Sequence, residues 1–373
     1  MTDPSHHLKV PRKRLARSMI RLTGRALLPL LFKLEITGRE NFPQRGPLLV
    51  VGNHTAAMEA VLLNIFSPWQ IEMLSAADTP AERITEVVAD LYGVIPLHRG
   101  SYDRAALSSA LDVLSQNGVV GLFPEGGIWE EGKKKALPGI AWLSYRSGAA
   151  VLPVGFGDTS GAMNAGLKFK RPKLSMHVGK LLEPAKLPPN IARKIYLQDY
   201  ADRVMEAVHE LVPQNDYKSE PEIVNEHFNL TVNIVNREGT PLPIPGAPAI
   251  QEGKALAKLL HRPAILKIFR VNLDLPVGPL ENLADHPATE DLIPACQTIL
   301  DYLDNDNPYL LTYRFGVREG GAMKQGLSQL RDLLIWCQEH GCQIEIEATR
   351  RYYSLKEGHE VIQTRQDIFQ SWM

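Results

Sequence analysis

The segment PLLVVGNHTAAMEAVLLNIF, residues 47–66, contains a short apolar run, a polar turn and a longer apolar run. This order predicts a buried strand over residues 47–52 and a helix over residues 56–66. Asn53 and His54 then lie on the turn between the two elements. The segment therefore predicts a strand–turn–helix unit with polar side chains where the strand ends.

His54 and Glu59 are the candidate catalytic pair in this segment. They are five positions apart, so they would diverge by about 140° on one ideal helix and could not meet. They can meet if His54 lies on the turn and Glu59 on the first turns of the helix. A carboxylate bonded to one imidazole nitrogen fixes the tautomer and leaves the other nitrogen to accept a proton from a hydroxyl. The alternative is an ordinary turn histidine after a helix cap at Asn53.

Strand-like and helix-like segments alternate through the following part of the chain. The expected strands cover residues 71–76, 94–97, 119–123, 151–156 and 174–178, and the expected helices cover residues 81–91, 102–116, 134–147 and 204–211. This alternation favours an α/β fold in which helices flank a mixed, largely parallel sheet.

The chain changes character near residue 213, where polar and then proline- and glycine-rich stretches begin. We expect four parts: a basic helix at residues 1–34, an α/β domain at 35–215, a linker or long loops at 216–249, and a smaller α+β domain at 250–373. In the last part we expect helices at residues 255–260, 288–303 and 323–339 and strands at residues 265–271, 309–315 and 343–348. It contains no chemical motif that we can identify.

The composition is that of a folded protein, with 44% hydrophobic and 22% charged residues among 373. The net charge of −1 hides a basic start, because residues 1–45 carry ten Lys or Arg and three acids. A basic head usually meets an anionic surface.

The three cysteines show no CxxC spacing, so we expect reduced thiols and no structural zinc. We expect neither a spanning helix nor a secretory signal.

Residues 12–30 form an amphipathic pattern on a helical wheel. One face carries the apolar residues Leu15, Met19, Leu22, Ala26 and Leu30, and the opposite face carries Arg14, Arg17, Arg21 and Arg25. Such a helix can lie flat among anionic headgroups. Changing the four arginines together to Glu is then expected to release the protein from anionic vesicles. A helix packed on its own domain and an organelle transit peptide are the alternatives.

Three further blocks lie at expected strand ends. GVIPLHRG, residues 93–100, places Arg99 after a strand, where its guanidinium suits a phosphate. GLFPEGG, residues 121–127, offers the Glu125 carboxylate to polyol hydroxyls, and Gly126 and Gly127 let a ligand approach the backbone. VLPVG, residues 151–155, has little specificity by itself. Each block alone also fits a surface arginine or a glycine turn.

Together the four blocks resemble the lysophospholipid and glycerol-phosphate acyltransferase family. Its NHx4D signature is matched by NHTAAME, its Gly-led strand ending in Arg by GVIPLHR, its FPEG block by FPEGGIW and its Val-Pro strand by VLPVG. The resemblance covers roughly residues 35–215. There are two departures: Glu59 stands where the family has Asp, and Ile128 stands where an Arg usually follows FPEG.

The resemblance implies that His54 is the general base and Glu59 its orienting carboxylate. Residues that would bind the acceptor are Asn53, Arg99, Glu125, Gly126 and Gly127. Lys133, Lys134 and Lys135 could replace the charge of the missing Arg, or form a solvated loop.

A direct transfer of this type needs acyl-CoA or acyl carrier protein as co-substrate, and we expect no cofactor, no metal and no nucleic-acid partner. The expected place is the cytoplasmic face of a membrane, as a peripheral or monotopic protein. A catalytically weak lipid-binding or scaffold protein of the same fold is the alternative. An acyltransferase acting on an amino-lipid or glycolipid is a third possibility.

Overall fold

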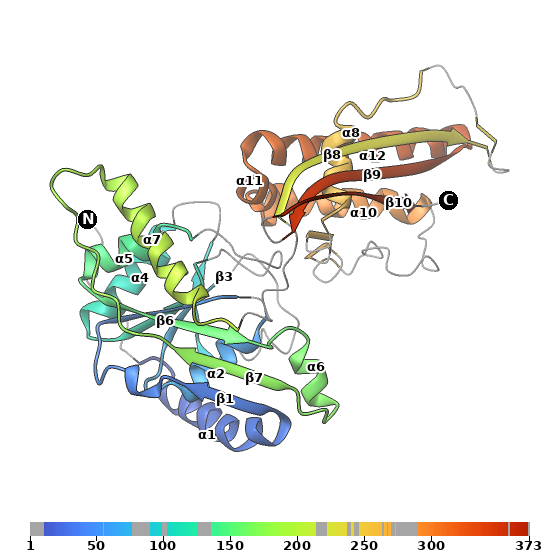
Figure 1. Ribbon diagram of the computed structural model, residues 1–373. Coiled ribbons are helices and arrows are strands. Elements are labelled where there is room, and N and C mark those ends of the chain that lie inside the picture. Colours follow the sequence, from blue (N-terminus) through green and yellow to red (C-terminus); the bar gives the residue numbers. More distant parts are fainter. Residues whose placement is uncertain are drawn as a thin grey trace. The chain divides into compact units, whose positions relative to one another are not determined.

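The computed structural model describes residues 11–54, 56–76, 90–98, 103–124, 136–213, 222–236, 240–241, 246–262, 265–266, 268–269, 273, 289–356 and 359–371 (Figure 1). The chain divides into two compact units. The N-terminal unit comprises Met1–Ala77, Arg83–His98 and Asp103–Lys218, and the C-terminal unit comprises Asp78–Glu82, Arg99–Tyr102 and Ser219–Met373.

The N-terminal unit is built on a seven-stranded sheet in the order β1-β7-β6-β2-β5-β3-β4. The strands are β1 (Lys33–Thr37), β2 (Leu48–Gly52), β3 (Glu72–Ala76), β4 (Ile95–Leu97), β5 (Val119–Leu122), β6 (Ala150–Gly157) and β7 (Lys173–Val178). Neighbouring strands are parallel except β6 and β7. The expected mixed, largely parallel sheet is confirmed. Strand β1 was not foreseen, because its segment KLEIT is short and only half-buried.

Helices cover both faces of this sheet. One apolar core contains residues of α1 (Arg14–Leu31), α2 (Met58–Phe66) and α6 (Ala162–Leu167), and the other contains residues of α4 (Arg104–Ser115), α5 (Gly139–Ser147) and α7 (Arg193–His209). A short 3-10 helix covers Arg39–Asn41. Strand β2 contributes to both cores, because Leu48 and Val50 enter one and Leu49 and Val51 the other. A strand buried on both faces reads as a continuous apolar run.

Helix α1 turns its arginine face toward the protein. Arg17 is fully buried and forms a bidentate ion pair with Glu72 of β3, at 2.6 and 2.7 Å. Arg21 donates to the carbonyls of Trp69 and Ser67. The prediction that this face meets anionic headgroups needs correction for Arg17 and Arg21, because their guanidinium groups already have protein partners, whereas Arg14 is exposed.

The apolar face of α1 points outward. Leu15 is 84% exposed and Leu22 68% exposed, and Met19, Leu27 and Leu30 are exposed as well. No helix in the described part of the chain combines the length and apolar composition needed to cross a membrane.

The C-terminal unit contains a three-stranded antiparallel sheet in the order β10-β9-β8 and several helices. Its elements are β8 (Glu222–Val235), α8 (Gly253–Leu260), α10 (Thr289–Asp301), a π-helical turn (Tyr302–Asp306), α11 (Leu310–Phe315), α12 (Val317–His340), β9 (Gln343–Lys356) and β10 (His359–Ser371). The expected α+β class is confirmed for this part of the chain.

Three local predictions in this unit are wrong. Residues 310–315 are helical and not a strand, and Leu310 and Leu311 are buried together on one side of α11. The described residues between 265 and 269 are also helical. Strand β8 lies inside the range expected to be a linker or long loops, where its alternation of apolar and polar residues was missed.

Candidate active site

Asn53 fixes the turn that follows β2. Its amide donates to the Phe156 carbonyl at 3.0 Å, and its Oδ1 accepts from the Phe156 N–H at 2.8 Å. Strands β2 and β6 are parallel neighbours, so these bonds tie together the carboxyl ends of two central strands. In this structure Asn53 therefore anchors the turn that carries His54, while its predicted contact with a substrate stays a prediction.

Glu59 lies in the first turn of α2 and is completely buried. Its two oxygens accept from the Ala56 N–H at 2.9 and 3.0 Å, and Oε1 also accepts from the Thr159 hydroxyl at 2.6 Å. Oε2 lies 3.6 Å from Nδ1 of His54. The structure thus places His54 on the turn and Glu59 on the helix, as the sequence predicts. The separation is within ion-pair range but longer than a hydrogen bond.

The imidazole of His54 stacks on the Phe123 ring. The ring centroids are 4.3 Å apart and the planes are inclined by 10°. The side chain of His54 is 20% exposed, and its Nδ1 atom is buried. One nitrogen thus faces the Glu59 carboxylate in the interior while part of the ring remains accessible. This is the arrangement that a histidine needs to exchange a proton with a bound ligand.

Gly52 makes room for this stack. A Cβ atom at this position would lie 2.6 Å from Cε2 of Phe156 and 3.1 Å from Cε1 of Phe123. A larger residue would therefore displace the Phe156 ring first and would also crowd the Phe123 ring beside His54. Phe123 directly follows β5, and its role against His54 was not foreseen from the sequence.

Thr159 is a second site residue that sequence reasoning missed. It is buried, and it follows the end of β6 by two residues. Parallel strands end at one edge of a sheet, so polar residues that follow β2 and β6 are expected to meet there. That expectation could have identified Thr159 as a neighbour of Glu59.

Several predicted ligand contacts lie outside the described residues. They are Arg99, Glu125, Gly126, Gly127, Lys133, Lys134 and Lys135. Their proposed contacts remain predictions. The strands that precede the first four, β4 and β5, run in the same direction as β2 and end at the same edge of the sheet.

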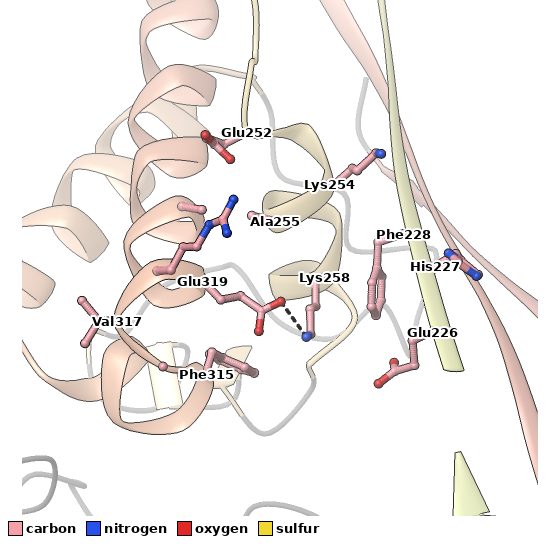
Figure 2. A pocket seen from close by; sticks show the side chains of 13 residues that line it. Glu226, His227, Phe228, Glu252, Lys254, Ala255, Lys258, Phe315, Val317 and Glu319 are labelled. Atoms are coloured by element: carbon pink, nitrogen blue, oxygen red, sulfur yellow. Dashed lines mark hydrogen bonds and ion pairs between the residues drawn. The ribbon is translucent and has the colours of Figure 1, made fainter. Parts of the chain in front are cut away.

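The C-terminal unit contains a cavity of about 650 Å³ (Figure 2). Lys258 on α8 forms an ion pair of 2.7 Å with Glu319 on α12, and its ammonium lies 5.9 Å from the ring centres of both Phe228 and Phe315. Three carboxylates and three cations line the cavity, so its charge favours neither sign of ligand. Among the described residues of the whole chain, no cluster of His, Cys, Asp or Glu suits a metal ion.

The segment that contains His54 is similar to known proteins. Residues 33–157 match the family model described as Acyltransferase. A 1-acyl-sn-glycerol-3-phosphate acyltransferase of Borreliella burgdorferi is 26% identical over 159 residues, which cover 42% of this chain and 64% of that relative. The match therefore spans less than two thirds of the relative's length.

A solved structure is also similar. The 1-acyl-sn-glycerophosphate acyltransferase PlsC of Thermotoga maritima matches with a TM-score of 0.39 and 18% identity, covering 53% of this chain and 81% of that one. A likeness of this size supports no argument about activity.

Proposed function

We propose that this protein transfers an acyl group from a thioester to a hydroxyl, because residues 33–157 match the family model described as Acyltransferase. The acceptor is a lysophospholipid or glycerol-phosphate-type molecule, the class named for the Borreliella relative. The donor is acyl-CoA or acyl carrier protein.

The observation that carries this proposal is the placement of the Glu59 carboxylate beside His54. A buried carboxylate 3.6 Å from Nδ1 favours the tautomer with its proton on that nitrogen. The second nitrogen, Nε2, is then the proton acceptor. Catalytic hydrogen bonds are often long in a free enzyme and shorten when substrate binds. A ligand that presses on the exposed part of the ring would close this gap.

In the proposed reaction, Nε2 of His54 removes the proton of the acceptor hydroxyl as its oxygen attacks the thioester carbonyl. The new C–O bond forms, and the carbonyl electrons move to oxygen. When they return, the C–S bond breaks and the leaving thiolate takes the proton from His54. Glu59 stabilises the imidazolium between these two proton transfers. General base catalysis of this kind contributes roughly 10²–10⁴-fold, and positioning of both substrates supplies much of the rest.

The test is acyl transfer from radiolabelled acyl-CoA and acyl carrier protein to a panel of lysophospholipids, glycerol phosphate, amino-lipids and glycolipids. His54→Ala should abolish transfer. His177→Ala is the matched control, because His177 lies on β7 and its Nδ1 contacts the Thr37 hydroxyl at 2.7 Å, away from the Glu59 cluster. Equal turnover by the His54 variant and the wild type would refute the role of His54. Absence of transfer to every acceptor would refute the activity.

A catalytically weak lipid-binding or scaffold protein is the second candidate. The 3.6 Å separation, which exceeds a hydrogen bond, is the observation that favours it. In that case lipid would bind without turnover, and His54→Ala would leave lipid binding unchanged. Lipid binding measured beside the transfer assay separates the two functions.

We also propose that α1 holds the protein on the cytoplasmic face of a membrane, as a peripheral or monotopic protein. The support is the exposed apolar face of the helix, with Leu15, Met19 and Leu22 in its first half. A helix with one apolar face lies in the plane of the bilayer interface, with that face in the boundary of the acyl chains. Arg17, Arg21 and Arg25 on the opposite face attach the helix to the rest of the unit.

A further inference from the structure

A basic loop with an exposed aromatic residue connects α6 to β7. It reads Lys168-Phe169-Lys170-Arg171-Pro172-Lys173. Phe169 is 78% exposed and the preceding Leu167 is 63% exposed, and the four cations are exposed as well. Phe169 has a φ of 54°, in the left-handed region that a bulky residue rarely adopts. An aromatic side chain held in the solvent by a strained backbone suggests a binding role.

The backbone of the loop is held in place by hydrogen bonds. The N–H groups of Lys168, Phe169 and Lys170 donate to carbonyls of α6 at 3.2, 2.8 and 3.0 Å. The side chain of Phe169 is therefore presented by an ordered turn, and little further ordering is needed when it meets a partner.

The loop adjoins the end of α1. The Arg171 guanidinium donates to the Pro29 carbonyl at 3.1 Å, and the Lys33 N–H donates to the Pro172 carbonyl at 2.9 Å. Leu27 and Leu30, near this end of the helix, are also exposed. Both elements belong to the N-terminal unit, where α1 lies along β1 and α6 precedes β7, the partner of β1 (Figure 1). The loop that carries Phe169 and the end of α1 that carries Leu27 and Leu30 thus lie next to one another.

We propose that residues 167–173 form a second membrane-binding element, selective for anionic lipid. Leu167 and Phe169 enter the acyl-chain boundary, and Lys168, Lys170 and Arg171 contact lipid phosphates. The proposal extends the membrane role of α1 but does not depend on acyl transfer.

The arrangement of charge argues for lipid as the partner. Arg17 and Arg21 of α1 are occupied by protein groups, whereas the cations of the loop are exposed and can reach anionic headgroups. A second copy of the chain is a poorer partner. In a two-fold contact centred on Phe169, the cations of the loop would face the same cations of the other copy.

The first test measures partitioning of the full chain onto vesicles of phosphatidylcholine alone and of equimolar phosphatidylcholine and phosphatidylglycerol. Each cation near an anionic leaflet contributes about fivefold to binding. The double variant Lys168→Gln/Lys170→Gln should therefore bind the anionic vesicles about thirtyfold more weakly and the neutral vesicles as wild type. Added salt should weaken binding of the wild type to anionic vesicles until it approaches that of the variant, because salt screens exposed charges.

The matched control is Lys186→Gln/Lys194→Gln. Lys186 precedes α7, Lys194 lies in its first turn, and both are exposed. Helix α7 covers the face of the sheet opposite to the one covered by α1 and α6. The control should bind both vesicles as wild type. Phe169→Asn, which suits a left-handed backbone, should weaken binding to both vesicles by about tenfold through lost apolar burial.

The second test reports insertion directly. Phe169→Cys, labelled with an environment-sensitive nitrobenzoxadiazole, should increase in fluorescence on anionic vesicles, whereas labelled Lys186→Cys should not. Burial raises the pKa of the Cys296 and Cys337 thiols to about 12, and all three native cysteines are buried, so they should escape labelling.

The proposal is overturned if the Lys168/Lys170 variant binds anionic vesicles as tightly as the control, or if the label at residue 169 stays in water. It is also overturned if sedimentation shows a dimer that the Phe169 variant dissociates without vesicles. None of these results depends on turnover, so they can refute membrane binding by residues 167–173 without refuting the proposed acyl transfer.

Discussion

Thr159 donates a 2.6 Å hydrogen bond to the Glu59 carboxylate, which in turn lies 3.6 Å from His54. The bond holds Oε1, and the Ala56 N–H contacts both oxygens, so the plane of the carboxylate is fixed with Oε2 toward the imidazole. The longer side chain of Glu59, compared with the family's Asp, is accommodated by these two donors. Thr159 is thus a positioning residue for the proposed base.

Thr159→Val should lower kcat, because the carboxylate loses the donor that orients it. A hydrogen bond to a charged group contributes about 1.5–3 kcal/mol, which corresponds to about 10–150-fold in rate. Thr159→Ser keeps the hydroxyl and should retain most of kcat. The measurements are kcat and KM, with nitrogen NMR of His54 to report its tautomer. An unchanged tautomer in the valine variant would argue against positioning, even if kcat fell.

Gly52→Ala should disturb the stack of Phe123 on His54, because its Cβ would come within 3.1 Å of the Phe123 ring and closer still to Phe156. Overpacking in a filled core costs about 1–3 kcal/mol of unfolding free energy. Gly139→Ala is the control, since nothing lies within 4 Å of a Cβ there. Thermal melts should show lower stability, and transfer assays lower activity, for Gly52→Ala but not for Gly139→Ala. Equal behaviour of the two variants would contradict the tight packing around Gly52.

Glu72→Gln should strongly destabilise the N-terminal unit. It leaves the buried Arg17 guanidinium without its anion, and breaking a buried ion pair costs about 3–5 kcal/mol. Glu35→Gln removes one partner of an exposed pair with Lys173 and should leave the unfolding free energy nearly unchanged. Denaturant titration measures both. Similar losses in the two variants would mean that burial of the Arg17–Glu72 pair has little effect.

The same pair predicts a pH dependence. Burial alone would raise the pKa of Glu72, but hydrogen bonds and charge from Arg17 and Arg12 outweigh it, so the pKa lies below its ordinary value of 4.5. The stability from this group is therefore fully present above pH 4.5 and is lost as the pH falls through the lower pKa of the folded protein. Stability curves in acid should fall more steeply for wild type than for Glu72→Gln. Parallel curves would contradict the shift.

Replacing Leu15, Met19 and Leu22 of α1 by Gln should release the protein from vesicles. Full burial of such side chains contributes about 1.5–3 kcal/mol each, so the partition coefficient should fall by at least about a hundredfold. The control changes to Gln the exposed residues Leu181 and Ile191, which precede α7, and Ile195, in its first turn. Vesicle sedimentation compares the two sets. If both sets bind as wild type, the apolar face of α1 is not a membrane contact.

Local sequence patterns predicted much of the N-terminal sheet. The buried run Leu48–Gly52 and the helix after it stand close to their expected positions, because a strand buried on both faces and a helix each leave a strong periodic signal. Strand β1 was not predicted, and helix α11 was predicted to be a strand. A short, half-buried or aromatic-rich segment fits the two-residue period of a strand as well as the 3.6-residue period of a helix. Tertiary packing decided these elements.

The sequence by itself predicted a strand over residues 47–52 and a helix over residues 56–66, which places His54 on the turn between them and Glu59 on the helix. Only the tertiary structure decided which distant groups complete the cluster. Thr159 and Phe123 reach it because parallel strands end together. Thr159 is 100 residues from Glu59 and Phe123 is 69 residues from His54, and no local pattern encodes such separations. The same holds for α1. A helical wheel separates its two faces, but only packing against Glu72 determines that the arginine face turns inward.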